Sequence, residues 1–366
     1  MRRLINNILL GGVPVSTLLL GFAQTAIAGT APTVVCVTST AEFQTALANA
    51  ASSLGDTTIE VAAGTYPIDS VLSYVTFDEK ALTIEGGFKP LMDQPCGDHV
   101  ADASLSILDG GGTSPILDLS NFLVAANMGA IKVRHLTFQH SLGAALHANT
   151  YGSATQVDID SNVFVDNSSP ADGGGVLFAG AVGVVRVANN LFAGNTSGGI
   201  TVFLTAAVAS GTPPHSGIFT NNTVTSNTTG ANYASVFINT PVGATFSLSN
   251  NIVWGNFGGD DLRLTLPGSI DSGPSTLANN DIGTFSGINF TETDDVNVDP
   301  RFVGGGSYAL ASDSPLIDAG TNAAPGGTGT YDLAGLARIV AIRSDTPVVD
   351  IGAYELQDLI FKDGYD

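Results

Sequence analysis

The chain has 366 residues, of which only 12% are charged and 44 are glycine. Its 33 acidic residues outnumber its 12 lysines and arginines, and the net charge of −21 makes nucleic acid an unfavourable partner. Many glycines and few charges are typical of a loop-rich, all-β protein rather than a helical one. An anionic polysaccharide would need a local basic patch or a bound cation.

Residues 1–28 have the features of a secretory signal peptide. Two arginines at the start are followed by an apolar run, and Ala26-Ile27-Ala28 forms a small-residue cleavage site. Glycines and a proline interrupt the apolar run, which is shorter than the ~20 residues of a membrane-spanning helix. We therefore expect a secreted protein, extracellular or at the cell surface, with no transmembrane segment.

A short amphipathic helix is predicted after Ser39. Ser39 and Glu42 match a capping box, and apolar residues recur at helical spacing until Gly55. Such a helix would cover the open end of a stack of strands, which is otherwise an exposed sheet edge. The two cysteines, Cys36 and Cys96, lie close to it in the sequence. Because export leads to an oxidising compartment, we expect them to form a disulfide that fixes this N-terminal cap.

One pattern recurs through the middle of the chain. Apolar and polar residues alternate within each copy, as in a strand with one buried face. No single copy can bury its own apolar face, so the copies must stack. These features predict a right-handed parallel β-helix with an N-terminal capping helix. A leucine-rich repeat is the alternative, but its leucine framework and helical return segments are missing. The clearest copies are VDIDSNVFVDN (157–167), VRVANNLFAGN (185–195), GIFTNNTVTSN (217–227) and FSLSNNIVWGN (246–256).

Asparagine occupies the same place in successive copies. Equivalent residues of stacked coils lie about 4.8 Å apart, so these side chains should form an amide ladder that hydrogen-bonds along the stack. The residues of this structural ladder are Asn162, Asn190, Asn222, Asn251 and Asn280.

Several motifs resemble known families. VAAGTY (61–66), LTIEGGF (82–88), ILDGGG (107–112) and the NN-containing coils resemble the pectate-lyase-like superfamily of right-handed β-helices. DPRFV, SPLIDAG, YDLAGLAR and VDIGAYE, between residues 299 and 355, resemble the terminal module of bacterial secreted choice-of-anchor Q proteins. This resemblance implies a fold but no single activity, because the superfamily includes lyases, hydrolases, epimerases and adhesins.

The resemblance completes a division of the chain into four parts. A signal peptide (1–28) is followed by the capping helix and β-helix (29–285), a C-terminal capping module (286–356) and a tail without an assigned role (357–366).

A strip of charged residues lies on the predicted outer face of the early coils. The repeat places Lys132, Asp158 and Arg186 above one another, with Arg134 and Asp160 beside them. On one hypothesis Asp158, Asp160 and Arg186 are catalytic, with a basic residue removing a proton next to a uronate, and Lys132 and Arg134 hold the sugar. The alternative is a set of ion pairs that fixes the register of the coils, each worth about 0.2–1 kcal/mol.

Other chemistry is less well supported. Of the motifs of a β-helix polygalacturonase only Asp260-Asp261 is present, and it is expected to be a loop pair. His135, His140 and His147 lie within one coil, but no carboxylate or cysteine completes a metal-binding spacing, so no metal site is expected. We expect no cofactor, and calcium is not indicated because each aspartate of the strip has a cation on an adjacent coil.

Aromatic residues provide a further contact surface. Phe203 and Phe237 are expected to point outward from a second strand of each coil, where they would stack on sugar faces unless long loops cover them.

These features favour a secreted or cell-surface β-helix protein, expected to be a monomer, that contacts extracellular polysaccharide without catalytic motifs. The alternatives are a polysaccharide lyase or glycoside hydrolase acting on an acidic glycan, and an adhesin or structural spacer.

Overall fold

The computed structural model describes residues 31–122, 129–170, 175–206, 215–265, 271–343 and 345–357. The predicted signal peptide and the tail after residue 357 lie outside these ranges. Within them, no helix is both long and apolar enough to cross a membrane.

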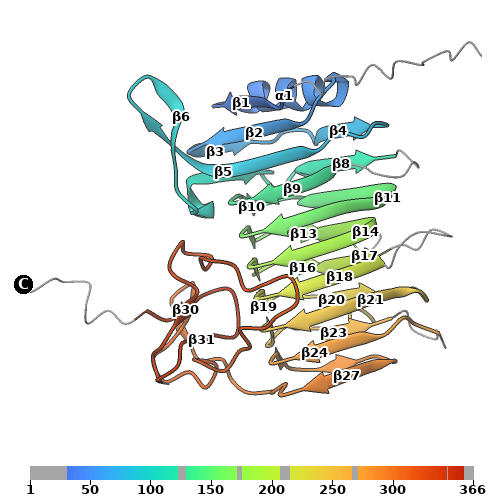
Figure 1. The fold of residues 1–366 in the computed structure, drawn as a ribbon, viewed down its shortest axis with the longest axis vertical. Helices are drawn as coiled ribbons and strands as arrows, with labels where there is room; N and C mark the ends of the chain where they lie inside the picture. The colour runs from blue at the N-terminus through green and yellow to red at the C-terminus, as the bar shows by residue number, and fades with distance from the viewer. Residues whose placement is uncertain are drawn as a thin grey trace, which may run out of the picture.

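The strands form the parallel β-helix that the repeats predict, with about seven turns stacked along one axis (Figure 1). Each turn contributes to three faces. The first face contains β1 (Thr33–Val37), β2 (Thr57–Ala62), β5 (Leu82–Leu91), β9 (Ala130–Arg134), the C-terminal halves of β11 (Leu146–Asp160) and β14 (Leu177–Ala188), β18 (His215–Thr220), β21 (Ala244–Ser249), β24 (Ser275–Ala278) and β27 (Phe290–Thr293).

The second and third faces complete each turn. The second face contains β3 (Gly64–Pro67), β7 (Ser106–Asp109), β10 (Thr137–Gln139), β12 (Val163–Val165), β15 (Leu191–Ala193), β19 (Thr223–Thr225), β22 (Ile252–Val253) and β25 (Asp281–Ile282). The short strands β13 (Ser168–Ser169) and β16 (Thr196–Ser197) pair beside it. The third face contains β4 (Leu72–Thr76), β8 (Leu117–Asn121), the N-terminal halves of β11 and β14, β17 (Val202–Ala206), β20 (Ala234–Asn239), β23 (Asp260–Leu264) and β26 (Phe285–Ser286).

The predicted capping helix, α1 (Thr40–Ser52), lies across the N-terminal end of the stack (Figure 1). The Ser39 side chain accepts a hydrogen bond from the backbone N–H of Glu42 at 3.3 Å, as an N-cap residue does. Phe43 and Leu47 are fully buried against the first coil. The helix therefore covers the apolar end of the solenoid that would otherwise be exposed.

A hairpin leaves the stack near this cap. β6 (Gln94–His99) pairs antiparallel with the end of β5 and is followed by the short helix η1 (Ala103–Leu105). The predicted disulfide is present: Cys36 in β1 and Cys96 in β6 are joined, with their Cα atoms 5.9 Å apart. It fastens β6 to the first coil and so fixes the position of the residues that follow Cys96.

The core between the faces is apolar and layered. Phe138, Phe164 and Phe192 occupy the same place in successive coils, and their rings stack at 4.8 and 4.6 Å between centroids. All three are fully buried. Such repeated contacts explain how short strands of two or three residues hold the second face together.

Two asparagine ladders run along the turns beside the second face. In the first, each backbone N–H donates to the side-chain oxygen of the next asparagine, at 2.9 Å from Asn162 to Asn190 and 3.0 Å from Asn190 to Asn222. This ladder continues through Asn251 to Asn280. The second ladder was not predicted and consists of Asn167, Asn195, Asn227 and Asn256.

Residues 298–343 and 345–357 form a C-terminal segment that packs against the side of the stack (Figure 1). It contains two short antiparallel pairs, β28 (Phe302–Gly304) with β29 (Ser307–Leu310) and β30 (Ile339–Val340) with β31 (Val348–Val349). Its apolar residues contact the outward side chains of the second face, such as Leu333 with Leu191 and Ile351 with Ile252.

The turn from the first to the second face contains one residue per coil in the left-handed conformation, with φ between 55° and 58°. We call these residues the corner strip. Asparagine, aspartate and histidine adopt this conformation more readily than most residues. The strip consists of His135, Ser161, Asn189, Asn221, Asn250, Asn279 and Asp294.

Candidate functional site

A cavity of about 590 Å³ lies at the N-terminal end of the corner strip. Its floor is formed by outward side chains of β5, β9 and β11, and its walls by the residues after β6 and by residues 329–335 of the C-terminal segment. The hairpin and the C-terminal segment project from the same side of the stack (Figure 1). The cavity therefore combines three parts of the chain that are far apart in sequence.

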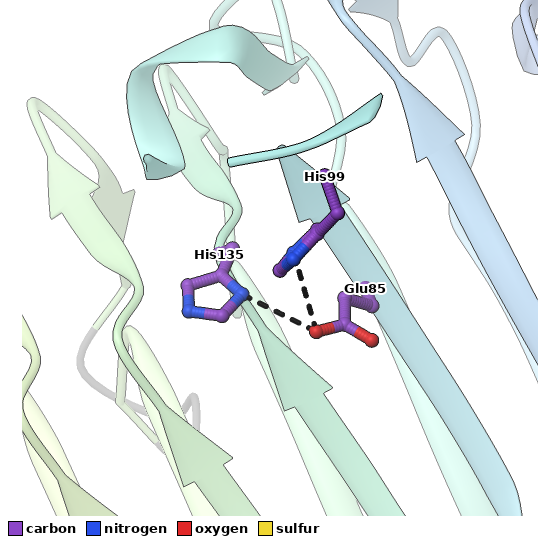
Figure 2. A group of neighbouring side chains, drawn as sticks. All are labelled: Glu85, His99 and His135. Carbon is purple, nitrogen blue, oxygen red and sulfur yellow. Dashed lines mark ion pairs between the residues drawn. The ribbon is translucent and has the colours of Figure 1, made fainter. Parts of the chain in front are cut away.

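Glu85, His99 and His135 gather within this cavity (Figure 2). The Glu85 Oε1 atom lies 3.3 Å from His99 Nε2 and 3.5 Å from His135 Nδ1. One nitrogen or oxygen atom from each of the three residues lies within 4.8 Å of the other two. The two imidazole rings are themselves 5.2 Å apart between centroids.

Each of the three side chains is positioned by a different element. Glu85 points outward from β5, in register with Arg134 on β9. His99 ends β6, three residues after the disulfide-bonded Cys96, and its ring packs at 4.7 Å against Phe88. His135 belongs to the corner strip, where its φ of 55° directs the side chain out of the coil.

The environment changes the protonation of two of these groups. Burial would raise the pKa of Glu85, but His135, Arg134 and His99 outweigh it and the pKa is lowered overall. Burial lowers the pKa of His99 despite the nearby Glu85. At neutral pH the site therefore contains a carboxylate next to a neutral His99 imidazole.

The charged strip has the register that the sequence predicts. Lys132 pairs with Asp158, which pairs with Arg186, and Arg134 pairs with Asp160 on adjacent strands. The ion pairs differ from the expected ones, however. Arg186 binds both aspartates, at 2.7 Å to Asp158 and 2.6 Å to Asp160.

One guanidinium therefore binds both carboxylates, which leaves Lys132 and Arg134 available. Lys132 forms no ion pair with any described residue, and Arg134 approaches only Glu85, at 3.9 Å, with its side chain 36% exposed. Burial lowers the pKa of Arg186, but Asp160 and Asp158 raise it overall, so Arg186 stays protonated. A permanently protonated Arg186 is suited to holding the two aspartates and unsuited to removing a proton.

Phe203 and Phe237 lie in adjacent coils, but they face each other. Their rings stack at 5.2 Å, and Phe178 packs edge-on against the other side of Phe203. Phe203 is half-buried and Phe237 is only 5% exposed. The prediction that Phe237 is available to a sugar is therefore wrong, because outward residues of successive coils lie close enough to bury one another.

Three aromatic residues that the sequence analysis overlooked are more exposed. Phe77 and Phe122 stack at 5.7 Å, and Phe122 and Tyr151 at 5.1 Å. They lie just beyond β4, just beyond β8 and within β11. Their exposed fractions are 68%, 40% and 42%.

The three histidines that are close in sequence are not close in space. His135 lies in the cavity, whereas His140 and His147 pair with Asp109 and Asp118 at 3.1 and 2.9 Å. Asp260 and Asp261, expected in a loop, belong to β23. Asp260 binds Arg263 at 2.7 Å, and Asp261 accepts the last hydrogen bond of the second asparagine ladder, from Asn256.

Comparison with known proteins adds no further identification, since no family model matches the chain and no curated protein matches it. The resemblance to pectate-lyase-like and choice-of-anchor Q proteins thus depends on the motifs quoted above, and the structure supports the β-helix part of it.

Proposed function

We propose that this protein is an extracellular β-helix protein that binds a polysaccharide, with the cavity over β5, β9 and β11 as its principal contact. The observation that carries the proposal is the composition of the cavity. It joins Arg134, a carboxylate, imidazole rings and the 55% exposed Tyr331 around about 590 Å³, a volume typical of ligand sites. Charged groups hydrogen-bond sugar hydroxyls strongly, and an exposed phenol ring stacks on a sugar face.

The side chains of Lys132 and Arg134, which are not held by the Arg186 cluster, extend this contact along the stack. Lys132 lies beside Arg134 on β9 and points to the same outer face. Because coils repeat at about 4.8 Å, a chain of sugars lying along the axis would meet a new row of side chains at each coil. Asp158, Asp160 and Arg186 support this surface as a fixed ion-pair cluster and are not proposed as catalytic residues.

The rest of the proposal concerns the place and family of the protein. The disulfide is compatible with an oxidising, extracellular compartment, and residues 1–28 are proposed as the signal peptide. We also propose kinship with the pectate-lyase-like superfamily, with residues 29–285 as cap and β-helix and residues 286–356 as an anchor-Q-like module. β27 pairs with β24, so the last strand of the stack lies within that proposed module.

The test is retention of the secreted protein on immobilised neutral and acidic polysaccharides. Arg134→Gln should weaken retention at least about tenfold, the value of one charged hydrogen bond, and Tyr331→Ala should weaken it by up to about tenfold through the lost stacking contact. Arg301→Gln and Tyr233→Ala are matched controls, since Arg301 forms an exposed pair with Asp313 elsewhere and Tyr233 lies on the third-face side. Both controls should bind as the unmodified protein does.

Several outcomes would overturn the proposal. If no polysaccharide retains the protein, a structural spacer is the better description. If Arg134→Gln and Tyr331→Ala bind normally, the contact lies elsewhere, for example on Phe77, Phe122 and Tyr151. New reducing ends or unsaturated sugars in the same incubations would show a hydrolase or a lyase instead of a binding protein.

A further inference from the structure

We propose that Glu85, His99 and His135 bind a divalent transition-metal ion of the zinc class at the floor of the cavity. The set offers two imidazole nitrogens and one carboxylate oxygen. Nitrogen-rich sites of this kind suit zinc and its neighbours, whereas calcium and magnesium prefer oxygen ligands only. The proposal differs from the expectation of no metal, which considered only histidines close together in sequence.

The distances between the ligand atoms fit such an ion. Zinc lies about 2.0–2.1 Å from nitrogen and oxygen ligands, so two ligands of a tetrahedral site are about 3.3–3.4 Å apart. The observed separations from Glu85 Oε1 are 3.3 Å to His99 Nε2 and 3.5 Å to His135 Nδ1. The three ligand atoms all lie within 4.8 Å of one another, so the two histidine nitrogens would approach each other when they share one ion.

His135 provides an independent observation. Its Nδ1 atom is buried and has no hydrogen-bond partner among the described residues, although Glu85 Oε1 lies at ion-pair distance, 3.5 Å away. A buried polar atom without such a partner requires an explanation. A metal ion between His135 Nδ1 and Glu85 Oε1 would satisfy it, because the bond is then to the ion.

The position of His135 in the corner strip points the same way. The five coils that follow have serine or asparagine at this left-handed position, and the last has Asp294. In the coils that carry Asn250 and Asn279 the side chain hydrogen-bonds the C-terminal segment. Among the described residues of the corner strip, only His135, beside Glu85 and His99, has a ring with a metal-binding nitrogen.

The three side chains are held in position by their neighbours, and the site is accessible from the cavity. The disulfide and Phe88 fix His99, and Arg134 lies 3.9 Å from Glu85, where it can orient the carboxylate. Three protein ligands leave a tetrahedral ion with a free position, and here that position faces the cavity. If the proposed function holds, the ion adds positive charge where an acidic protein must accept a sugar carboxylate or hydroxyl.

Metal binding can be measured without any polysaccharide. After treatment with a chelator and dialysis, the full secreted protein is titrated with zinc chloride by calorimetry and with cobalt chloride by visible absorption. We expect one ion per chain and the absorption of tetrahedral cobalt. Glu85→Gln, His99→Gln and His135→Asn should each weaken zinc binding at least about a hundredfold, more than the loss of an orienting residue does.

His140→Asn is the matched control. His140 is also in the left-handed conformation, with φ of 51°, and it also contacts a carboxylate, Asp109. It should bind zinc normally. His135→Asn is the decisive variant because asparagine fits this corner position in other coils, so its fold should be retained and can be checked by circular dichroism.

The proposal fails if the protein does not bind zinc stoichiometrically, or if the three variants bind as tightly as the unmodified protein. Stoichiometric zinc binding without retention on any polysaccharide would overturn the proposed function alone. If the protein binds zinc in the titration but its retention on polysaccharide is the same with and without chelator, the ion takes no part in the sugar contact.

Discussion

The corner strip has a covered part, where the C-terminal segment packs on residues such as Asn250 and Asn279, and an open part, where His135 lines the cavity. Both parts have the same backbone conformation. At Asn250, the side chain accepts a hydrogen bond from the Thr321 backbone at 2.7 Å and donates one to its carbonyl at 3.0 Å. At His135, the side chain lies in a cavity. The repeat thus fixes where a side chain is placed, and the residue at that place decides whether it holds the C-terminal segment or is available to a ligand.

The two parts also treat charge differently. Under the C-terminal segment, Arg338 is fully buried, donates to the Asn189 side chain and to the Gly352 and Ala353 carbonyls, and lies 3.9 Å from Glu355. In the cavity, Arg134 remains partly exposed and loosely paired. A fully buried cation is a structural group, whereas a partly exposed one can still bind a ligand.

The largest expected effect on the covered part is that of pH. Burial raises the pKa of Glu355 to about 8 and that of Asp281 to about 7, whereas the unfolded chain releases these protons near pH 4 to 4.5. Between about pH 5 and about pH 8 the folded protein therefore holds more protons, and the free energy of unfolding falls as the pH rises. Since one pKa unit corresponds to about 1.4 kcal/mol, the loss should reach several kcal/mol.

Urea unfolding at a series of pH values measures this loss. Asp281→Asn imitates the protonated group and keeps the oxygen that accepts from the Val298 N–H. This variant should show a flatter dependence on pH. A stability that rises toward pH 8 would contradict the inferred burial of both acids.

The next largest effect is expected from Arg338→Met. This change keeps much of the side-chain volume but leaves Asp332 and Glu355 without their cation, and removing one partner of a buried ion pair costs about 3–5 kcal/mol. The loss should grow as the pH rises through about 8, where Glu355 releases its proton, and should be smaller at lower pH, where Glu355 is protonated. Arg301→Met is the control, because the exposed pair of Arg301 with Asp313 is worth less than about 1 kcal/mol. Equal losses in both variants would show that the Arg338 cluster contributes no special stability.

The asparagine ladder should be less sensitive than the Arg338 cluster. Asn222→Ala removes the acceptor of the Asn190 N–H and the donor to the Val187 carbonyl, inside the stack. Unsatisfied buried groups cost about 1–3 kcal/mol each, so we expect a loss of about 2–4 kcal/mol by urea unfolding. Asn49→Ala on the exposed side of α1 should change the stability by less than about 0.5 kcal/mol. If Asn222→Ala leaves the free energy of unfolding unchanged, the ladder is a consequence of coil stacking and does not stabilise the stack.

The sequence predicted the fold well because its information was local and repeated. The alternation within each copy places Lys132, Asp158 and Arg186 in the register that the strands have. The second asparagine ladder could also have been found, since each copy ends in asparagine. What the alternation could not show was the direction of the side chains, such as the Arg186 guanidinium that reaches two aspartates or the Phe237 ring that packs on Phe203.

The candidate site was missed for a different reason. Glu85 belongs to a coil that precedes the recognisable copies, and His99 comes from an antiparallel strand that has no place in the repeat. Their approach to His135 depends on the disulfide and on the path of the hairpin, which spacing along the chain does not encode. One signal was present, however: aligning the copies places a histidine where later copies have serine or asparagine.

The smallest expected effect is that of giving the open part of the strip the residue of the covered part, by the change His135→Asn. In the metal-free protein, His135→Asn should change the free energy of unfolding by less than about 0.5 kcal/mol, because histidine and asparagine both adopt the left-handed conformation readily. His140→Asn controls for the general effect of this change in the same coil. With zinc added, the unmodified protein should gain stability in proportion to the logarithm of zinc concentration, and His135→Asn should not. A marked loss of stability in metal-free His135→Asn would mean that His135 supports the coil in the way that Asn250 does, and that the open end of the strip is structural after all.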